Sequence, residues 1–491
     1  MVAAADFDEV VDVVAIGYGF AGACAAITAH DGGASVIILE KMPHGGGNSR
    51  VSAGQGFVAL PGDQAIQDLV NWLDAMCLQT TPRDVLEAFA RGTRDLPPFL
   101  RSLGGEFSVP KTKMLTGRYP SAVKGPNFPE IATTRPMFDK RCLEGPDDVP
   151  PSRRLWELFS KAVAGRGINV RYQTPATDLI RDDNGSIVGV SAAAGGKTIR
   201  IGARKGVVMS CGGFIANPAM RWDYAAPKPL KFAGNPGNTG DGIGMAIRAG
   251  ADLWHMTRTS TFIGFQSPDY EAAFCIFFPG PGFIWVDKYG RRYIDETSVE
   301  LHDFDRVFGY IDPDKVEFPR IPTWGIFDEE TRNGGALTWP IAGYNRETYR
   351  WSDDNSVELE KGWIRRAETI EALAEITNID ERTLTETLGR YNSGCASGID
   401  PEFGRPGETL KTLEPPYYAI ELHPVALNTQ GGAKRDAAAR VIDTRGQPIP
   451  GLYSAGEFGS IWGHLYPGGG NITEAMVFGR IAGQSILARS A

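Results

Sequence analysis

The N-terminal segment carries the pattern that most restricts the fold of this chain. "VVDVVAIG" at 10–17 is a continuous apolar and β-branched run, typical of a strand buried on both faces. "GYGFAG" at 17–22 follows, an alanine-rich segment then closes on glycine, and "ASVIILEK" at 34–41 is a second buried strand. This order predicts a strand–helix–strand unit of a parallel sheet, and therefore an α/β fold.

Each small residue of the turn has a physical reason in a dinucleotide-binding unit. Gly17 allows the tight turn, and Gly19 lets a pyrophosphate approach the backbone N–H groups at a helix N-terminus. Ala21 and Gly22 allow close packing of helix and strand, and Glu40 can accept hydrogen bonds from a ribose. The segment therefore predicts dinucleotide binding; the alternative is a glycine-rich turn without a ligand.

Further glycine-rich segments follow in the first half of the chain. "GGGNSRVSAGQG" at 45–56 can wrap the rest of a large cofactor, or is a plain surface loop. Residues 168–209 are predicted as short strands, with a hairpin turn at "DDNG". "NTGDGIGMAIRAGA" at 238–251 is a second glycine-rich entry to a helix, with Asp241 placed to cap it.

The character of the sequence changes near residue 258. Aromatic residues and prolines become dense, and a helical stretch with charged faces follows at 365–394. After 414 the strand and glycine pattern returns, and a final helix is expected at 471–489. We expect a first domain made of residues 1–257 and 415–491, interrupted by a second domain of residues 258–414.

Composition excludes several classes of function. A length of 491 residues predicts two domains. The net charge of -9 argues against a surface that binds nucleic acid or anionic membranes. No apolar window of roughly 18 residues predicts a membrane span, and the N-terminus is predicted as a strand rather than a signal peptide. The six cysteines form no CxxC pair and the six histidines show no metal spacing. We therefore expect free thiols, a cytoplasmic location and no metal site.

Motifs spread along the chain carry a family resemblance. They include "GYGFAGACAA", "GGNSRVSAG", "NTGDGIGMAIRAGA", "FIWVDKYGRRYIDE", "TQGGAKRDAAARVIDTRGQPIPGLYSAGE" and "GGGNITEAMVFGRIAG". Together they resemble the FAD-dependent family of fumarate reductase flavoproteins and 3-ketosteroid dehydrogenases, over nearly the whole chain except about 60–165. The resemblance implies a Rossmann-type FAD-binding domain of the glutathione-reductase type. It also implies an inserted catalytic domain (an α+β cap), with substrate held against the flavin at the junction.

The resemblance also implies which residues contact FAD. Glu457 is expected to bind the ribityl hydroxyls, Ala176 to offer backbone contacts to adenine, and the helix starting near Asn471 to point at the flavin. The covalent-flavin relatives place a histidine where this chain has Ser49 or Arg50, so FAD is expected to be non-covalent. The full set of expected FAD contacts is Gly17, Gly19, Phe20, Ala21, Gly22, Glu40, Lys41, Gly47, Asn48, Ser49, Ser52, Gly54, Ala176, Cys211, Gly212, Asp241, Gly456, Glu457, Asn471 and Ile472.

The substrate positions favour a ketone over a dicarboxylate. The fumarate-reducing branch clamps its substrate with a histidine and an arginine, where this chain has Leu427 and Tyr466-Pro467. A substrate carboxylate without a cation in a dry pocket would be costly. In the ketosteroid dehydrogenases a tyrosine hydroxyl and a glycine N–H four residues on bind the ketone oxygen, and Tyr466 and Gly470 have this spacing. The alternative for Tyr466 is a half-buried packing residue.

The general base does not match the family pattern. Leu301 stands where the ketosteroid dehydrogenases place a tyrosine, and the candidates that remain are His302, Tyr310 and Tyr119. His302 could equally be a helix-face or capping residue. The expected reaction forms a C=C bond next to a ketone, in a steroid or a smaller cyclic ketone. A base takes the α-proton and the β-hydride passes to FAD N5.

Two other functions stay open at this point. One is reduction of an activated alkene that is not a dicarboxylate, and the other is flavin binding without catalysis. No second GxGxxG segment occurs in a strand–helix–strand context, so an external electron acceptor is expected rather than bound NAD. The oligomeric state does not follow from the sequence.

Overall fold

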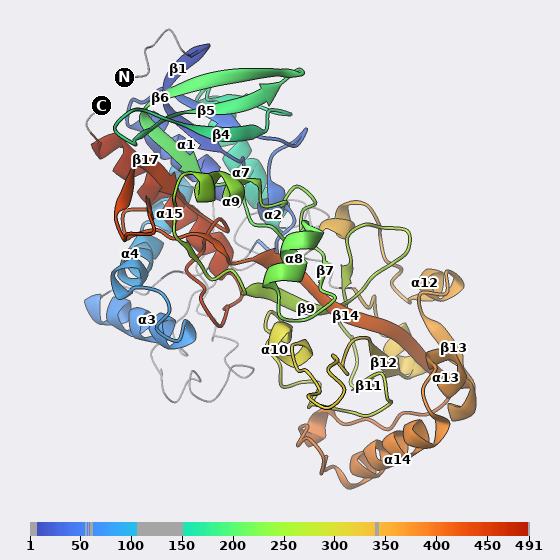
Figure 1. The fold of residues 1–491 in the computed structure, drawn as a ribbon. Helices are drawn as coiled ribbons and strands as arrows, with labels where there is room; N and C mark the ends of the chain where they lie inside the picture. Colours follow the sequence, from blue (N-terminus) through green and yellow to red (C-terminus); the bar gives the residue numbers. More distant parts are fainter. Residues whose placement is uncertain are drawn as a thin grey trace. The chain divides into compact units, whose positions relative to one another are not determined.

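The computed structural model describes residues 7–54, 56, 58, 62–105, 151–338 and 343–489. The chain divides into two compact units. The first contains residues 1–224, 235–258 and 428–491, and the second contains residues 225–234 and 259–427. The units are described one at a time below (Figure 1).

The first unit is built on an eight-stranded mixed sheet. Strands β3, β2, β1, β6 and β17 are parallel neighbours, while β16 at one edge and the hairpin β4–β5 are antiparallel. The predicted strands at 10–17 and 34–41 and the hairpin turn at "DDNG" are confirmed. The sheet strands are β1 (Glu9–Ile16), β2 (Val36–Leu39), β3 (Asn169–Arg171), β4 (Ala176–Arg181), β5 (Ile187–Ala194), β6 (Lys197–Met209), β16 (Arg440–Ile442) and β17 (Pro448–Ser454).

Both faces of this sheet are buried, which explains the continuous apolar pattern of β1. Val13 and Ala15 join the core on one face, while Val14 and Ile16 join the core on the other. The first core includes α1, α3, α4, α5, α7 and α15, and the second includes α9 and β5. The helices of the unit are α1 (Phe20–Asp31), α2 (Gly47–Arg50), α3 (Asp63–Met76), α4 (Arg83–Arg94), α5 (Leu96–Ser102), α7 (Pro151–Gly165), α8 (Pro218–Tyr224), α9 (Asp241–Arg248) and α15 (Gly470–Ala488), and a small second sheet pairs β8 (Leu253–Trp254) with β15 (Gly432–Ala433).

The last helix packs directly on the first. Figure 1 shows α15 beside α1, although most of the chain separates them in sequence. A Cβ on Gly479 would lie 2.5 Å from the carbonyl oxygen of Ala21, and one on Gly483 would lie 2.8 Å from that of Ala25. These two glycines, one turn apart, therefore let the two helix backbones approach each other closely.

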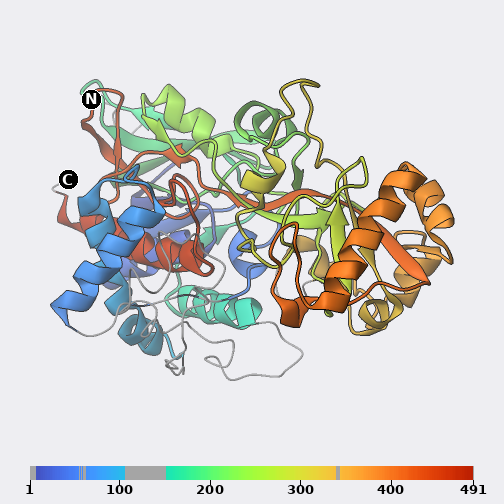
Figure 2. The same ribbon diagram turned by 90° about the horizontal axis from the view of Figure 1, so that it is seen from below.

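The second unit is built on a seven-stranded sheet around the long strand β14. Residues of β11 alternate between two cores: Phe283 and Trp285 pack on one side with α10, Ile284 and Val286 on the other with α13 and α14. Figure 2 shows α14 running alongside the strands of this unit. The elements are β7 (Lys231–Phe232), β9 (Thr259–Phe265), β10 (Phe274–Cys275), β11 (Phe283–Val286), β12 (Thr323–Phe327), β13 (Arg365–Ala367), β14 (Tyr417–Thr429), α10 (Phe304–Phe308), α11 (Glu329–Asn333), α12 (Ser356–Glu360), α13 (Ile370–Thr377) and α14 (Glu381–Ser397).

The units differ from the expected domain ranges at two places. Residues 225–234 and 415–427 belong to the second unit, because β7 and β14 pair within its sheet. As functional domains, the ranges 1–257, 258–414 and 415–491 stay a prediction.

The sequence predicts that the chain has no membrane span, no disulfide and no metal site. No helix among them is both long and apolar enough to cross a membrane. The five cysteines in this part of the chain carry free thiols. No group of three or more His, Cys, Asp or Glu side chains there is arranged to hold a metal ion. The cytoplasmic location and the lack of a metal site in the whole chain stay predictions.

Candidate active site

Four parallel strands of the first unit end at one edge of the sheet. Ile16 of β1 lies opposite Leu39 of β2 and Met209 of β6, and Met209 lies opposite Ser454 of β17. The residues that follow these strands therefore meet at the carboxyl edge, where open α/β sheets bind their ligands. They include expected FAD contacts from four distant parts of the sequence: Gly17, Glu40, Lys41, Cys211, Gly212, Gly456 and Glu457.

The glycine turn after β1 is tightly packed. Gly17 has φ +95, and a Cβ on Gly22 would lie 2.1 Å from the carbonyl oxygen of Gly17. Gly19 is the N-cap residue of α1 and has no side chain of its own to cap the first turn. The N–H of Phe20 donates to Ser49 Oγ at 3.0 Å. The turn therefore brings backbone N–H groups and the Ser49 loop together at the start of α1, as an anion site requires.

Glu40 holds this turn through backbone groups. Its carboxylate is buried and accepts the N–H of Tyr18 at 2.9 Å and the N–H of Met42 at 2.8 Å. The next residue, Lys41, donates to Thr239 and Asp241 at 2.5 Å each. Sequence reasoning assigned Glu40 to a ribose alone; in the structure it also fixes the two loops beside it.

Glu457 is the centre of a hydrogen-bond network. Its carboxylate accepts from Asn48 Nδ2 at 2.8 Å, from Asn238 Nδ2 at 3.1 and 3.2 Å, and from the N–H of Thr429 at 3.1 Å. Burial raises the pKa of this carboxyl to about 7 against the effect of these donors. Asn48 also accepts from the N–H of Asn235 at 2.7 Å, so it links three segments. Asn238 opens the glycine-rich segment at 238–251 but was not among the expected FAD contacts.

The other expected FAD contacts lie near the same edge or on elements beside it. Ser52 Oγ donates to the carbonyl of Ser49 at 2.8 Å and accepts from the N–H of Gly54 at 3.3 Å. Asp241 begins α9, and a Cβ on Gly242 would lie 2.2 Å from Cys211 Sγ. The remaining members are Gly47 at the start of α2, Ala21 in α1, Ala176 at the start of β4, Gly212 with φ +69 and the buried Ile472 in α15.

The start of α15 carries both an expected FAD contact and the expected ketone-binding pair. Tyr466 is buried, with its ring edge-on to Trp462, and its hydroxyl accepts the N–H of Asn471 at 3.2 Å. The N–H of Gly470 donates to the carbonyl of Pro467 at 2.9 Å. The structure therefore places Tyr466 beside Gly470, and a ketone oxygen would have to share the Gly470 N–H with Pro467.

Asn471 indicates that a polar ligand fits here. Its side-chain Oδ1 and Nδ2 are both buried and have no hydrogen-bond partner within the described part of the chain. Buried amide groups are almost always paired, so this one calls for a partner with a donor and an acceptor. The pyrimidine edge of a flavin offers both, and the N-terminus of α15 favours the negative charge of a reduced flavin.

Below this turn lies a buried ion pair that sequence reasoning missed. Glu474, one turn after Asn471, pairs with Arg435, and both side chains are 0% exposed. The guanidinium also lies 4.4 Å from the ring centre of Phe478. The pair therefore ties the first turns of α15 to the loop after β15.

The loop that carries Tyr466 is held at several carbonyl groups. Arg258 donates to the carbonyl of His464 at 2.7 and 3.1 Å, and Thr81 Oγ1 donates to that of Ile461 at 2.7 Å. His255 Nδ1 lies 2.8 Å from the carbonyl oxygen of Ser460, and burial lowers the pKa of this imidazole. These contacts fix the path of the loop before Tyr466. No sequence motif marked them.

In the second unit the substrate positions that depart from the family pattern lie together. Leu301 and Leu427 pack on one small apolar cluster, which we call the Phe262 cluster: Phe262, Ala233, Ala273, Cys275 and Val425. The ring of His302 meets the ring of Phe262 edge-on at 4.7 Å. The cluster therefore brings two leucines and one candidate base to the same place.

His302 lies in a cluster of ionisable groups. Its Nδ1 lies 2.9 Å from Glu300 Oε1, and the two side chains are 12% and 11% exposed. The neighbouring Asp303 is buried, and this burial together with the charge of Glu300 raises its pKa to about 7. Glu300 was not a candidate from sequence, although it stands only two residues before His302.

The other candidate bases have different surroundings. Tyr310 is 47% exposed, and the Arg320 guanidinium lies 4.7 Å from its ring centre. Tyr119 lies outside the described residues. Of the two candidates within the described residues, His302 is 12% exposed and lies beside the Phe262 cluster, whereas Tyr310 is largely open to solvent.

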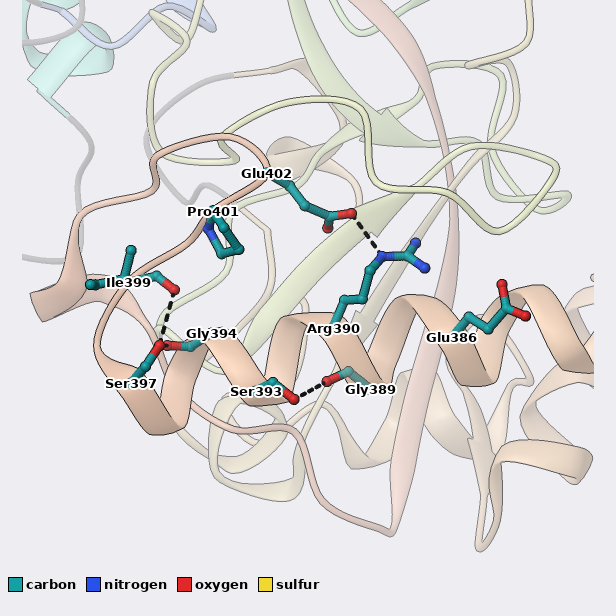
Figure 3. A pocket seen from close by; sticks show the side chains of 9 residues that line it. All are labelled: Glu386, Gly389, Arg390, Ser393, Gly394, Ser397, Ile399, Pro401 and Glu402. Atoms are coloured by element: carbon teal, nitrogen blue, oxygen red, sulfur yellow. Dashed lines mark hydrogen bonds and ion pairs between the residues drawn. The ribbon is translucent and has the colours of Figure 1, made fainter.

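A separate hollow of about 570 Å³ lies along α14 in the second unit, lined by Glu386, Gly389, Arg390, Ser393, Gly394, Ser397, Ile399, Pro401 and Glu402. Figure 3 shows Arg390 reaching toward Glu402, with 2.8 Å between Nε and Oε1. None of the expected site residues lines this hollow.

Comparison with known proteins identifies the family. A family model described as FAD binding domain matches residues 12–473. The chain belongs to this FAD-binding family. It is a flavin-dependent oxidoreductase with the mixed α/β fold of the ketosteroid dehydrogenase and fumarate reductase flavoproteins, as the resemblance implied.

Relatives come from both branches of the family. A probable fumarate reductase from Shewanella frigidimarina (strain NCIMB 400) is 30% identical, over 98% of this chain and 76% of its own length. A 3-oxosteroid 1-dehydrogenase from Mycolicibacterium smegmatis is 28% identical over 98% of both chains. This chain spans only half the length of an NADH:acrylate oxidoreductase from Vibrio harveyi, to which it is 29% identical over 97% of its own residues.

A solved structure shows the same fold. It is the 3-ketosteroid delta1-dehydrogenase from Sterolibacterium denitrificans in complex with 1,4-androstadiene-3,17-dione, with a TM-score of 0.80 and 24% identity. The match covers 98% of this chain and 100% of that chain.

Proposed function

We propose that this protein is a dehydrogenase that forms a C=C bond between the α and β carbons of a ketone, with FAD as hydride acceptor. The observation that carries the proposal is the Phe262 cluster, where Leu301 and Leu427 pack together beside His302. Apolar side chains at both positions favour a neutral substrate surface, because they cannot compensate a carboxylate. The steroid dehydrogenase relatives support a cyclic ketone, and the steroid itself is the finer part of the proposal.

Tyr466 is proposed to polarise the ketone. Its oxygen already accepts the N–H of Asn471, so its own proton can be donated to a carbonyl oxygen. A donor aimed at the oxygen that becomes negative lowers the barrier to loss of the α-proton. The N–H of Gly470 is the proposed second donor, and it would turn from the carbonyl of Pro467 to the ketone oxygen.

His302 is proposed as the base that takes the α-proton, because it is the half-enclosed candidate beside the Phe262 cluster. The α C–H electron pair enters the new C=C bond as the β-hydride leaves. FAD, when bound, accepts that hydride and both of its electrons. We further propose that FAD is bound non-covalently by the expected contacts at the carboxyl edge, and that an external acceptor reoxidises it.

A second candidate function is reduction of an activated alkene. The names of the Shewanella and Vibrio relatives favour this direction. The same residues would then act in reverse, with His302 giving a proton to the α carbon and Tyr466 binding the carbonyl of the alkene.

Anaerobic bleaching of the flavin tests the proposal. The holoenzyme is mixed with 3-ketosteroids, cyclohexanones and succinate, and flavin absorbance is followed. We expect bleaching by at least one ketone and none by succinate. Absence of bleaching by every ketone, together with oxidation of the dye-reduced enzyme by an alkene, would establish the reductase instead.

Tyr466→Phe tests the role of the hydroxyl. Loss of an oxyanion donor is expected to lower kcat about 10²–10³-fold while the FAD spectrum is retained. Tyr224→Phe is the matched control in the same unit, since its ring packs against Phe214 and its hydroxyl has no assigned role. Equal turnover of Tyr466→Phe and the control would exclude Tyr466 from the reaction.

A further inference from the structure

The Glu300–His302 pair has the geometry of a positioned proton acceptor. Glu300 Oε1 and Oε2 lie 2.9 and 3.1 Å from His302 Nδ1. The main-chain N–H of His302 also donates to Glu300 Oε2 at 2.6 Å. One carboxylate thus engages both the ring and the backbone of the same residue, which limits rotation of the imidazole.

The neighbouring β-strand holds the backbone of His302 in place. The N–H of Thr261 in β9 donates to the carbonyl of His302 at 2.9 Å, and Phe262 of the same strand supplies the edge contact to the ring. The position of His302 is therefore fixed from the carboxylate side and from the strand side.

The charged groups around the pair are mostly acidic. Asp303 and Asp305 are buried, and Arg306 Nη2 lies 3.3 Å from Asp303 Oδ2. With Glu300, three carboxyl groups therefore lie close to His302 in the sequence, against one arginine that pairs with Asp303.

From this arrangement we propose that Glu300 is the positioning residue that makes His302 a base through Nε2. The carboxylate keeps the proton on Nδ1, so Nε2, which Glu300 does not engage, carries the lone pair. The α C–H bond breaks, its proton moves to Nε2, and the resulting imidazolium is stabilised by Glu300. FAD, when bound, would accept the β-hydride with both of its electrons, while His302 holds the α-proton. This inference rests on the proposed function for the identity of the substrate. The expected tautomer of His302 is independent of the proposed function.

The first experiment reads the tautomer and is independent of turnover. The holoenzyme is labelled with ¹⁵N-histidine. Among the signals of the six histidines, that of His302 is identified as the one missing in His302→Asn. We expect neutral His302 to carry its proton on Nδ1. In Glu300→Gln we expect the Nε2–H tautomer to appear beside it, because the carboxylate that accepts the Nδ1 proton is gone. A proton on Nε2 in the wild type would overturn the proposal, whatever the substrate.

The second experiment reads proton transfer. Turnover of whichever ketone or alkene is active, and deuterium exchange at its α carbon, are measured across pH. His302→Asn should lose about 10²–10⁴-fold in kcat. Glu300→Gln should lose about tenfold or more, with the rising limb of the pH profile moved to lower pH and KM little changed. An unshifted profile in Glu300→Gln at wild-type rate would overturn the role of Glu300.

The second unit contains a matched control pair. Glu421 Oε1 lies 2.9 Å from His423 Nε2, again two residues apart, on β14. Glu421→Gln removes the same type of contact and should leave turnover and the pH profile unchanged. If no substrate is found while the tautomers of wild type and Glu300→Gln are as expected, the proposed function fails and the positioning of His302 by Glu300 stands. If turnover is found but neutral His302 carries its proton on Nε2, the proposed function stands and the positioning role of Glu300 fails.

Discussion

The two units present their functional groups in different ways. In the first unit the expected FAD contacts follow the ends of parallel strands, and much of the work is done by backbone N–H groups and glycines. In the second unit the candidate groups are side chains on an irregular segment before α10, where Glu300, His302 and Asp303 gather. A strand-end site is constrained by the sheet, whereas a loop site depends on individual side chains. We therefore expect the strand-end site to lose FAD when its buried contacts are disturbed, and the loop site to lose activity when a single charged side chain is replaced.

The largest expected effect lies at the start of α15. Glu474→Gln leaves the buried charge of Arg435 without its partner and should lower the free energy of unfolding by about 3–5 kcal/mol. Replacing both residues, as Arg435→Met with Glu474→Leu, should restore most of the loss. Urea unfolding followed by flavin release measures both. A mild effect of Glu474→Gln would show that this part of the first unit does not depend on the ion pair.

The next effect tests the dependence of the first unit on close packing. Gly22→Ala places a Cβ 2.1 Å from the Gly17 carbonyl oxygen and should cost about 1–3 kcal/mol of stability, with reduced FAD content after purification. Gly244→Ala in α9 is the control, because its nearest atom, Arg248 Nη1, is 3.5 Å away. Full FAD occupancy in Gly22→Ala would contradict the close approach.

A smaller effect tests charge in the second unit. The pKa of Asp303 is raised from 3.8 to about 7, so the folded state binds this proton more tightly than the unfolded state. Its contribution to stability is complete below pH 3.8 and is lost as pH rises through about 7. Asp303→Asn should remove this decline. The measurement is the change in Tm between pH 5 and pH 8, compared between Asp303→Asn and the wild type. The comparison is needed because the pKa of Glu457 is raised as well, and its pH-dependent contribution is present in both proteins. Equal declines would mean that Asp303 is ionised when folded.

The smallest effect is expected at the hollow on α14. Arg390 and Glu402 are 49% and 29% exposed, so Arg390→Gln should change stability by less than about 1 kcal/mol. Turnover should not change, because none of the expected site residues lines the hollow. A clear loss of turnover would place a function there and weaken the contrast between the units.

The sequence was most informative where backbone geometry dictates residue type. The β1–α1–β2 unit follows from buried strands around a glycine turn, since few other residues tolerate that geometry. Within regular elements the boundaries were less predictable. The helical stretch expected at 365–394 is two helices preceded by β13, because Asn378 adopts φ +56 and Asp380 caps α14. A continuous polar and apolar pattern does not show where such a break falls.

Side-chain partnerships were the least predictable part. Glu457 meets Asn238 and Asn48 only because four segments converge at one sheet edge, and the sequence separations hide this. Glu300 and His302 are only two residues apart, yet outside a helix or strand this spacing does not predict whether two side chains meet. Whether two such groups meet is decided by the local path of the chain, which here is set by the contact of His302 with β9.

The packing of α15 on α1 has a consequence for how the protein is made. Both β17 and α15 leave the ribosome after residues 259–427, so the first sheet waits for its fifth parallel strand while the second unit is already available to fold. During that interval the face of α1 that Gly479 and Gly483 later cover is exposed. We therefore expect FAD capture to follow synthesis of the C-terminal segment, and a chain that ends before α15 to leave this face of α1 uncovered.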